Sequence, residues 1–136
     1  MPAFTLLPNR TNPTTAPIPR RLLGVWAHPD DEAYLSSGLM AQVVDSGGDV
    51  TVVTATLGEH GTSDPAQDGT ARFAWHRHGE LAACLGEVGV TDLRVLGYED
   101  GTCDRVPVSR GAHDIAKVIC SVRPDVIVTF GPDGIT

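Results

Sequence analysis

The 136-residue sequence lacks several features that would assign it to a membrane, secreted or zinc-finger class. No apolar run approaches the roughly 20 residues of a membrane-spanning helix. The first 20 residues are rich in proline and threonine and contain no apolar core of a signal peptide. The 3 cysteines form no C-x-x-C pair and are odd in number, which fits neither a disulfide framework nor a metal finger. We therefore expect reduced thiols in a cytoplasmic protein, with Cys84 and Cys120 as small core residues of helices.

Basic residues are also scarce. The sequence has 10 lysines and arginines against 17 aspartates and glutamates, which gives a net charge of −7. This balance argues against a nucleic-acid or anionic-membrane partner, because both are recognised through clustered positive charge. A small molecule is the partner that we expect.

Apolar runs and helical patterns alternate along the chain. Nearly continuous apolar runs at 22–27, 50–57, 93–97 and 126–130 predict strands that are buried on both faces. Helical spacing between them predicts one helix marked by Leu35, Leu39 and Val43, a second over 73–88, and a third over 115–122 that ends at Arg123-Pro124. After an irregular arm at 1–20, residues 21–136 therefore predict an α/β domain, a Rossmann-like three-layer sandwich with a mainly parallel sheet.

Acidic and imidazole side chains follow each predicted strand. The stretches are HPDDE at 28–32, GEHG at 58–61, YEDG at 98–101 and GPDG at 131–134. In a parallel α/β sheet, ligands bind outside the carboxyl ends of the strands, so we expect these loops to meet at one edge. The turn after the first strand contains no G-x-G-x-x-G, and its carboxylates would repel a pyrophosphate, which argues against a dinucleotide site.

His28 and Asp31 form an H-x-x-D pair directly after the first strand. Imidazole and carboxylate are typical zinc ligands, and this spacing can turn both side chains toward one metal. Asp30 would then point elsewhere and could take a proton from metal-bound water. The alternative is structural: Asp31 or Glu32 complements the N-terminus of the following helix, and His28 is a surface residue.

The stretch AHPDDE at 27–32 resembles the signature of the PIG-L/LmbE-like family of zinc-dependent N-deacetylases. TLGEHG at 56–61, RHGEL at 77–81, LGYEDG at 96–101 and RPDVIVTFGPDGIT at 123–136 resemble further family blocks in the same order. The resemblance implies that His28 and Asp31 bind Zn²⁺ and that Asp30 is the general base. The implied reaction is attack of zinc-bound hydroxide on the acetamide of an amino sugar or its conjugate, which releases acetate and a free amine. Family members often assemble, which allows a homo-oligomer.

The resemblance also implies substrate-binding roles for Arg77 and Asp100, and it places Glu59 beside the metal, where it would line the site. From the residues alone, other interpretations stay open. Arg77 could pair with Glu80 or Asp92 on a helix surface, Asp100 could be a turn residue, and Glu59 a solvated loop charge.

The sequence departs from the family pattern after GPDGIT at 131–136. In the family this block runs into a histidine segment, commonly G-H-P-D-H, so the resemblance implies a third zinc ligand, a histidine, beyond Thr136. The domain is therefore expected to lack its C-terminal part. Catalytic zinc normally takes three protein ligands, so we expect this chain alone to bind zinc weakly and to be inactive or weakly active. A member of the family that binds or assembles without catalysis is the alternative function.

Overall fold

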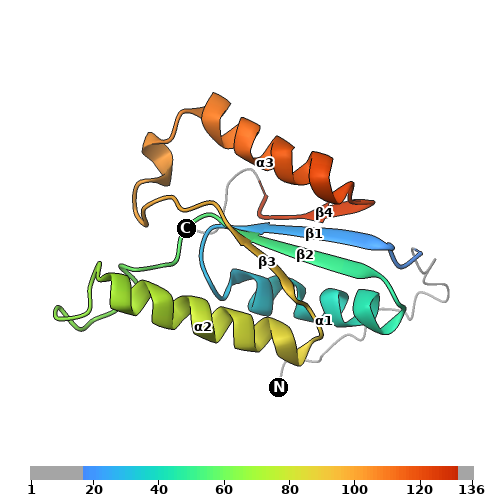
Figure 1. Ribbon diagram of the computed structural model, residues 1–136, viewed down its shortest axis with the longest axis horizontal. Coiled ribbons are helices and arrows are strands. Elements are labelled where there is room, and N and C mark those ends of the chain that lie inside the picture. Colours follow the sequence, from blue (N-terminus) through green and yellow to red (C-terminus); the bar gives the residue numbers. More distant parts are fainter. Residues whose placement is uncertain (1–16, 132–136) are drawn as a thin grey trace, which may run out of the picture.

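The computed structural model describes residues 17–131 (Figure 1). The elements alternate in the predicted order: β1 (Arg21–Trp26), α1 (Asp31–Asp45), β2 (Asp49–Thr54), α2 (Ala71–Glu87), β3 (Asp92–Val95), α3 (Val108–Val122) and β4 (Val126–Val128), with a short 3₁₀ turn η1 (Cys103–Arg105) before α3. No helix in this part of the chain is long and apolar enough to cross a membrane. Most of the predicted arm, and the stretch from Pro132 to Thr136, lie outside the described residues.

The strands form one parallel sheet in the order β3-β2-β1-β4. α1 and α2 cover one face of this sheet and α3 covers the other (Figure 1). The predicted three-layer α/β architecture is therefore confirmed. Because every strand runs in the same direction, the loops that follow β1, β2 and β3 all leave from the same edge.

The core lies on both faces of the two central strands. Leu22 of β1 is 1% exposed and belongs to the cluster that includes residues of α1 and α2, whereas its neighbour Leu23 packs with Val118 of α3 on the opposite face. Successive side chains of a strand point to opposite faces, so a continuous apolar run serves both clusters.

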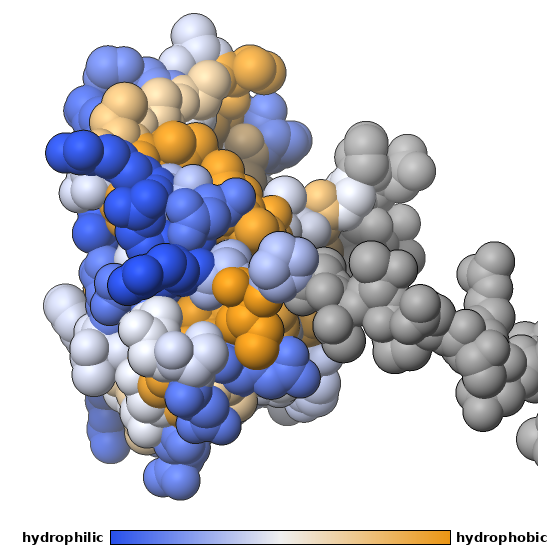
Figure 2. All heavy atoms as spheres, turned by 90° about the vertical axis from the view of Figure 1, so that its right-hand side faces the viewer, coloured by the Kyte–Doolittle hydropathy of each residue, from blue (hydrophilic) through white to orange (hydrophobic). Residues whose placement is uncertain are grey.

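The outer strands β3 and β4 differ from the prediction that all strands are buried on both faces. In β3 no residue is fully buried, and Val95 is 37% exposed. Val126 and Ile127 are 41% and 45% exposed, because β4 pairs only with β1 among the described residues and leaves its other side open. Figure 2 faces the end of the molecule at which the strands begin, and apolar residues there reach the surface between hydrophilic ones.

Of the three apolar residues that mark the first predicted helix, Val43 is buried and Leu39 packs against the core, but Leu35 does not. The buried face of α1 consists of Glu32, Ser36, Met40 and Val43, and Leu35 is 48% exposed. Successive helical residues are about 100° apart, so Leu35 points well away from the stripe that contains Ser36. The same angular spacing explains why Cys84 and Cys120 are exposed.

The predicted core positions of Cys84 and Cys120 are incorrect, since both thiols are exposed, as is Cys103. Cys84 precedes the buried Leu85 by one residue, and Cys120 follows the buried Val118 by two. Each cysteine therefore lies beside the apolar stripe of its helix rather than within it.

Candidate functional site

Three of the four predicted loops meet at the carboxyl edge of the sheet. His28 follows β1, Glu59 and His60 follow β2, and Asp100 follows β3. The Asp100 carboxylate accepts hydrogen bonds from the His28 ring at 3.0 Å and from the backbone N–H of His60 at 3.1 Å. The backbone N–H of Asp100 donates to Oε1 of Glu59 at 2.9 Å. Asp133, in the fourth loop, lies outside the described residues.

The His28 imidazole lies between two carboxylates. Its Nε2 is 3.0 Å from Oδ1 of Asp100, and its Nδ1 is 3.8 Å from Oδ2 of Asp31. Asp31 also accepts the backbone N–H of His28 at 2.9 Å, which fixes its side chain against the turn. When Nε2 carries the proton that Asp100 accepts, the lone pair of Nδ1 faces a carboxylate oxygen. A cation between those two atoms stabilises such an arrangement, which is the usual environment of a metal-binding histidine.

The predicted zinc ligands come together as a pair rather than as a set of three. His28 and Asp31 are neighbours, and residues 17–131 contain no group of three His, Cys, Asp or Glu side chains that could hold a metal. The third ligand was predicted to be a histidine beyond Thr136, and Thr136 itself lies outside the described residues. The third ligand therefore stays a prediction.

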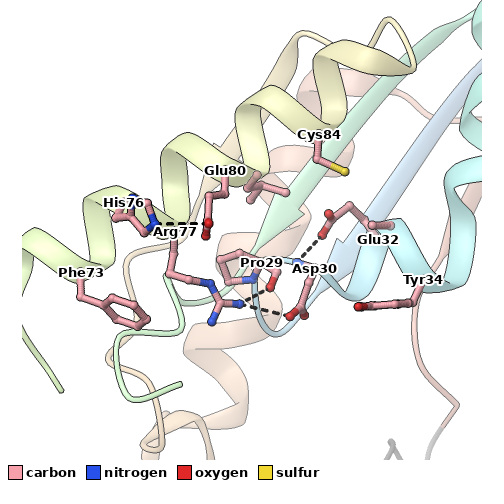
Figure 3. Close-up of a pocket in the computed structure, with 11 residues that line it drawn as sticks. Pro29, Asp30, Glu32, Tyr34, Phe73, His76, Arg77, Glu80 and Cys84 are labelled. Carbon is pink, nitrogen blue, oxygen red and sulfur yellow. Dashed lines mark hydrogen bonds and ion pairs between the residues drawn. The ribbon is translucent and has the colours of Figure 1, made fainter. Parts of the chain in front are cut away.

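Asp30 has an unusual backbone conformation, with φ of 111° at the N-cap of α1. Its side chain, 57% exposed, turns toward α2 rather than toward His28, and Oδ2 accepts from Nη2 of Arg77 at 3.2 Å (Figure 3). The same guanidinium nitrogen donates to the carbonyl oxygen of Pro29 at 2.6 Å. Arg77 therefore holds the strained turn at both its backbone and its side chain.

Arg77 reaches the turn past two glycines of the loop after β2. A Cβ atom on Gly61 would lie 2.8 Å from Nη1 of Arg77, and one on Gly58 would lie 3.6 Å from its Cζ. Real Cβ atoms essentially never approach another atom as closely as 2.8 Å, so the bare backbone at Gly61 leaves room for the guanidinium.

The surface pairing that was the alternative for Arg77 is wrong, because this side chain is only 17% exposed and contacts Asp30. Glu80 instead contacts His76 at 3.2 Å, and Asp92 contacts Arg94 at 2.9 Å.

Glu32 is a residue beside the candidate site for which the sequence suggested only a role at the N-terminus of the helix. It is 1% exposed; its Oε2 accepts from the backbone N–H of Asp30 at 3.1 Å, and its Oε1 has no hydrogen-bond partner within residues 17–131. Burial raises the pKa of the Glu32 carboxyl above its ordinary value. A signal was present: Glu32 precedes Ser36 by four residues and Met40 by eight, so it shares their face of α1.

The side chain of His60 is 44% exposed. It also closes the loop after β2, because its Nδ1 is 3.0 Å from Oδ1 of Asp68. This hydrogen bond to Asp68 raises the pKa of the His60 imidazole. Gly69 leaves room for the ring, since a Cβ there would lie 2.8 Å from Cε1 of His60.

Comparison with known proteins places this geometry in context. Residues 23–136 match the profile of a family described as PIG-L, GlcNAc-PI de-N-acetylase. The 1D-myo-inositol 2-acetamido-2-deoxy-α-D-glucopyranoside deacetylase 2 of Catenulispora acidiphila is 40% identical over 138 residues, which cover 85% of this chain and 45% of that protein. The chain thus spans about half the length of the relative.

Two solved structures share the fold. The N,N'-diacetylchitobiose deacetylase of Pyrococcus horikoshii superimposes with a TM-score of 0.71 at 28% identity, over 85% of this chain and 41% of that one. The 4-carboxy-2-hydroxymuconate hydratase of Pseudomonas putida reaches a TM-score of 0.69 at 21% identity, over 85% of this chain and 50% of the other. The fold therefore occurs in proteins named for different reactions, and the reaction has to be argued from the site.

Proposed function

The chain belongs to the GlcNAc-PI de-N-acetylase (PIG-L) family, and from this membership we propose that it carries part of the active site of a zinc-dependent N-deacetylase. The substrate class would be an N-acetylated amino sugar or its conjugate, and the products acetate and a free amine. The observation that carries the proposal is the position of His28 between Asp31 and Asp100, on the edge that also presents Asp30.

The donor set fits zinc in part. His28 Nδ1 and Asp31 Oδ2 are 3.8 Å apart, which is less than the sum of a zinc–nitrogen and a zinc–oxygen bond, about 4.2 Å. Both atoms can therefore bond to one ion. Because residues 17–131 offer no group of three such ligands, the third would come from outside these residues, as the family pattern beyond Thr136 implies. A zinc ion held there would supply a Lewis acid for the amide carbonyl and a bound water of lowered pKa.

In this proposal Asp30 is the general base. Its Oδ2 is bonded to Arg77, and the side chain remains 57% exposed, so its other oxygen can accept a proton from the attacking water. The proton would then pass to the leaving nitrogen, so that the product departs as an amine. The contact with Arg77 would hold the carboxylate in a fixed direction.

Asp100, Glu59 and Arg77 stay predicted substrate-binding residues. The contacts of these residues also favour a second role, which is to position the side chains of His28 and Asp30. If His28 donates from Nε2 to Asp100, its Nδ1 would be available to a metal, and Glu59 holds the Asp100 backbone in place. A polar sugar would find the remaining lone pairs of these carboxylates and the guanidinium of Arg77 along the same edge.

The names of the relatives support the substrate class. The Catenulispora acidiphila protein is named for an acetamido sugar linked to inositol, and the Pyrococcus horikoshii protein for a chitobiose with acetylated nitrogens. Both names share a 2-acetamido sugar, and this shared group is what we propose for the present chain. A binding or assembly function without catalysis is the second candidate, favoured by the presence of two rather than three metal ligands in the described residues.

The experiment is a primary-amine release assay on the inositol-linked acetamido sugar, N,N'-diacetylchitobiose and N-acetylglucosamine. It compares the 136-residue chain with a chimera in which residues after Gly131 are replaced by the corresponding remainder of the Catenulispora acidiphila protein. We expect weak or no release from the chain and clear release from the chimera. In the chimera, Asp30→Asn should lower the rate by about 100-fold or more, and Asp104→Asn, in the exposed turn η1, should not. A zinc-loaded chimera that releases no amine would favour the binding function.

A further inference from the structure

A cavity of about 440 Å³ lies between α1 and α2 (Figure 3). Its lining includes Asp30 at the turn, Glu32 and Tyr34 from α1, and Phe73 and Cys84 from α2. His28, Asp31 and Asp100 do not line it. The cavity therefore adjoins the proposed catalytic edge at Asp30 without including the metal-binding side chains, and its volume is in the range of small-molecule sites.

The Glu32 carboxylate is the group in this cavity that has an unused hydrogen-bond acceptor. Its residue is 1% exposed, and Oε2 already accepts from the backbone of Asp30, whereas Oε1 has no partner within the described chain. Figure 3 shows the carboxylate on the side of α1 that faces α2. Buried carboxylate oxygens normally accept hydrogen bonds, and an unpaired one favours any donor that enters the cavity.

The other charges of the lining are already paired. Arg77 donates to Pro29 and Asp30, and His76 contacts Glu80 at 3.2 Å. Three carboxylates, those of Asp30, Glu32 and Glu80, therefore share the lining with one guanidinium. An anionic ligand would meet an excess of negative charge, whereas a cationic donor would offset it.

The aromatic side chains of the lining fit the same kind of ligand. Tyr34, 86% exposed, and Phe73 contribute rings on opposite helices. Ring faces attract ammonium groups and pack against apolar carbon. We propose that the cavity between α1 and α2, which shares Asp30 and Arg77 with the proposed catalytic edge, binds a small primary amine with an apolar body, whose ammonium group donates to Oε1 of Glu32.

Cys84 provides a direct way to test this site, because its thiol is exposed and lines the cavity. The full 136-residue chain is equilibrated with the symmetric disulfide of cysteamine, 2-mercaptoethanol or 3-mercaptopropionate, whose halves carry ammonium, hydroxyl or carboxylate on the same two-carbon spacer. The cysteine sulfur bonds to one sulfur of the reagent, and the other half leaves as a free thiol. Mass spectrometry of peptides then gives the fraction of mixed disulfide at Cys84. Cys120, exposed on α3 across the sheet, is the internal reference.

We expect cysteamine to be favoured over 3-mercaptopropionate at Cys84 by about threefold or more relative to Cys120. Glu32→Gln keeps the shape of the side chain and should abolish this excess, whereas Glu80→Gln should keep most of it. Equal preferences at the two cysteines would overturn the proposal. So would an excess that persists in Glu32→Gln.

A second measurement needs no substitution. Free propylamine should shift the backbone NMR signals of α1 and α2 in the wild-type chain, and propionate at the same concentration should not. Propylamine shifts that are missing from α1 and α2, or that propionate reproduces, would contradict an amine site.

Discussion

Among single residues, Asp30 shows that the proposed catalytic edge carries backbone strain. Its φ of 111° is a conformation that glycine adopts readily and other residues rarely do. The side chain that the proposed reaction needs is therefore present at a position where its Cβ is unfavourable.

Two substitutions distinguish the effect of backbone strain at Asp30 on stability from the effect of losing its carboxylate. Asp30→Gly and Asp30→Ala both remove the contact with Arg77, but only glycine relieves the backbone. We expect Asp30→Gly to be more stable than Asp30→Ala by about 1–2 kcal/mol, measured by urea unfolding at pH 7. Equal stabilities of the two variants would show that the turn is not strained.

The His60–Asp68 contact predicts a shifted titration. Because Asp68 accepts from the ring, the pKa of His60 lies above its usual value of about 6.5. The pairing stabilises the loop fully below that usual value and is lost as the pH rises through the raised pKa. NMR titration of the ring should show a lower midpoint in Asp68→Asn. Asp64→Asn, in the same loop but without contact to His60, should leave the midpoint unchanged, and a shift of equal size in both variants would contradict this account.

At the scale of elements, one carboxylate connects the starts of β1 and β4. Asp125 accepts from the backbone N–H groups of Arg20 and Arg21 and from the Arg21 guanidinium at 3.2 Å. These donors, the Arg21 side chain above all, lower the pKa of Asp125. A lowered pKa means that the contribution to stability is present above the unfolded value of about 3.9 and is lost as the pH falls through the folded value.

Asp125→Asn should therefore unfold at lower urea concentration than the wild type at pH 7. The difference should shrink as the pH is lowered below about 3.9, because the wild-type carboxyl then becomes protonated as well. Asp45→Asn, at the end of α1, is the matched surface control and should show no such trend. A difference that is independent of pH would mean that Asp125 acts through shape rather than charge.

The order and type of the elements could be predicted from the sequence, because apolar runs and helical spacing are local properties. The full buried face of α1 could not be read from its apolar residues, since Leu35 is exposed although Leu39 packs against the core, and the polar Glu32 and Ser36 are buried. Packing against β1 and β2 decides which of these residues are buried. The exposure of β4 likewise depends on which strand lies beside it, and this is a property of the assembled sheet.

At the scale of the whole molecule, parallel topology explains why the loops could be predicted to meet. Strands that run in one direction bring His28 and Asp100 to one edge although 72 residues separate them. The pairing of Arg77 with Asp30 could not be predicted from the residues alone, because it depends on how α2 crosses the loop at Gly58 and Gly61. The sequence pattern singled out Arg77 and Asp30 separately, and the packing of α2 brings the two side chains into contact.

The central claim is that the edge bearing His28 and Asp31 is a metal site, and calorimetric titration of Zn²⁺ into the 136-residue chain tests it most directly. We predict one zinc per chain, bound weakly, with an affinity that falls by about tenfold or more in His28→Ala and in Asp31→Ala. His113→Ala, on α3, should bind like the wild type. Binding that is unchanged in all three variants, or absent from the wild type, would contradict a metal site built on these two residues.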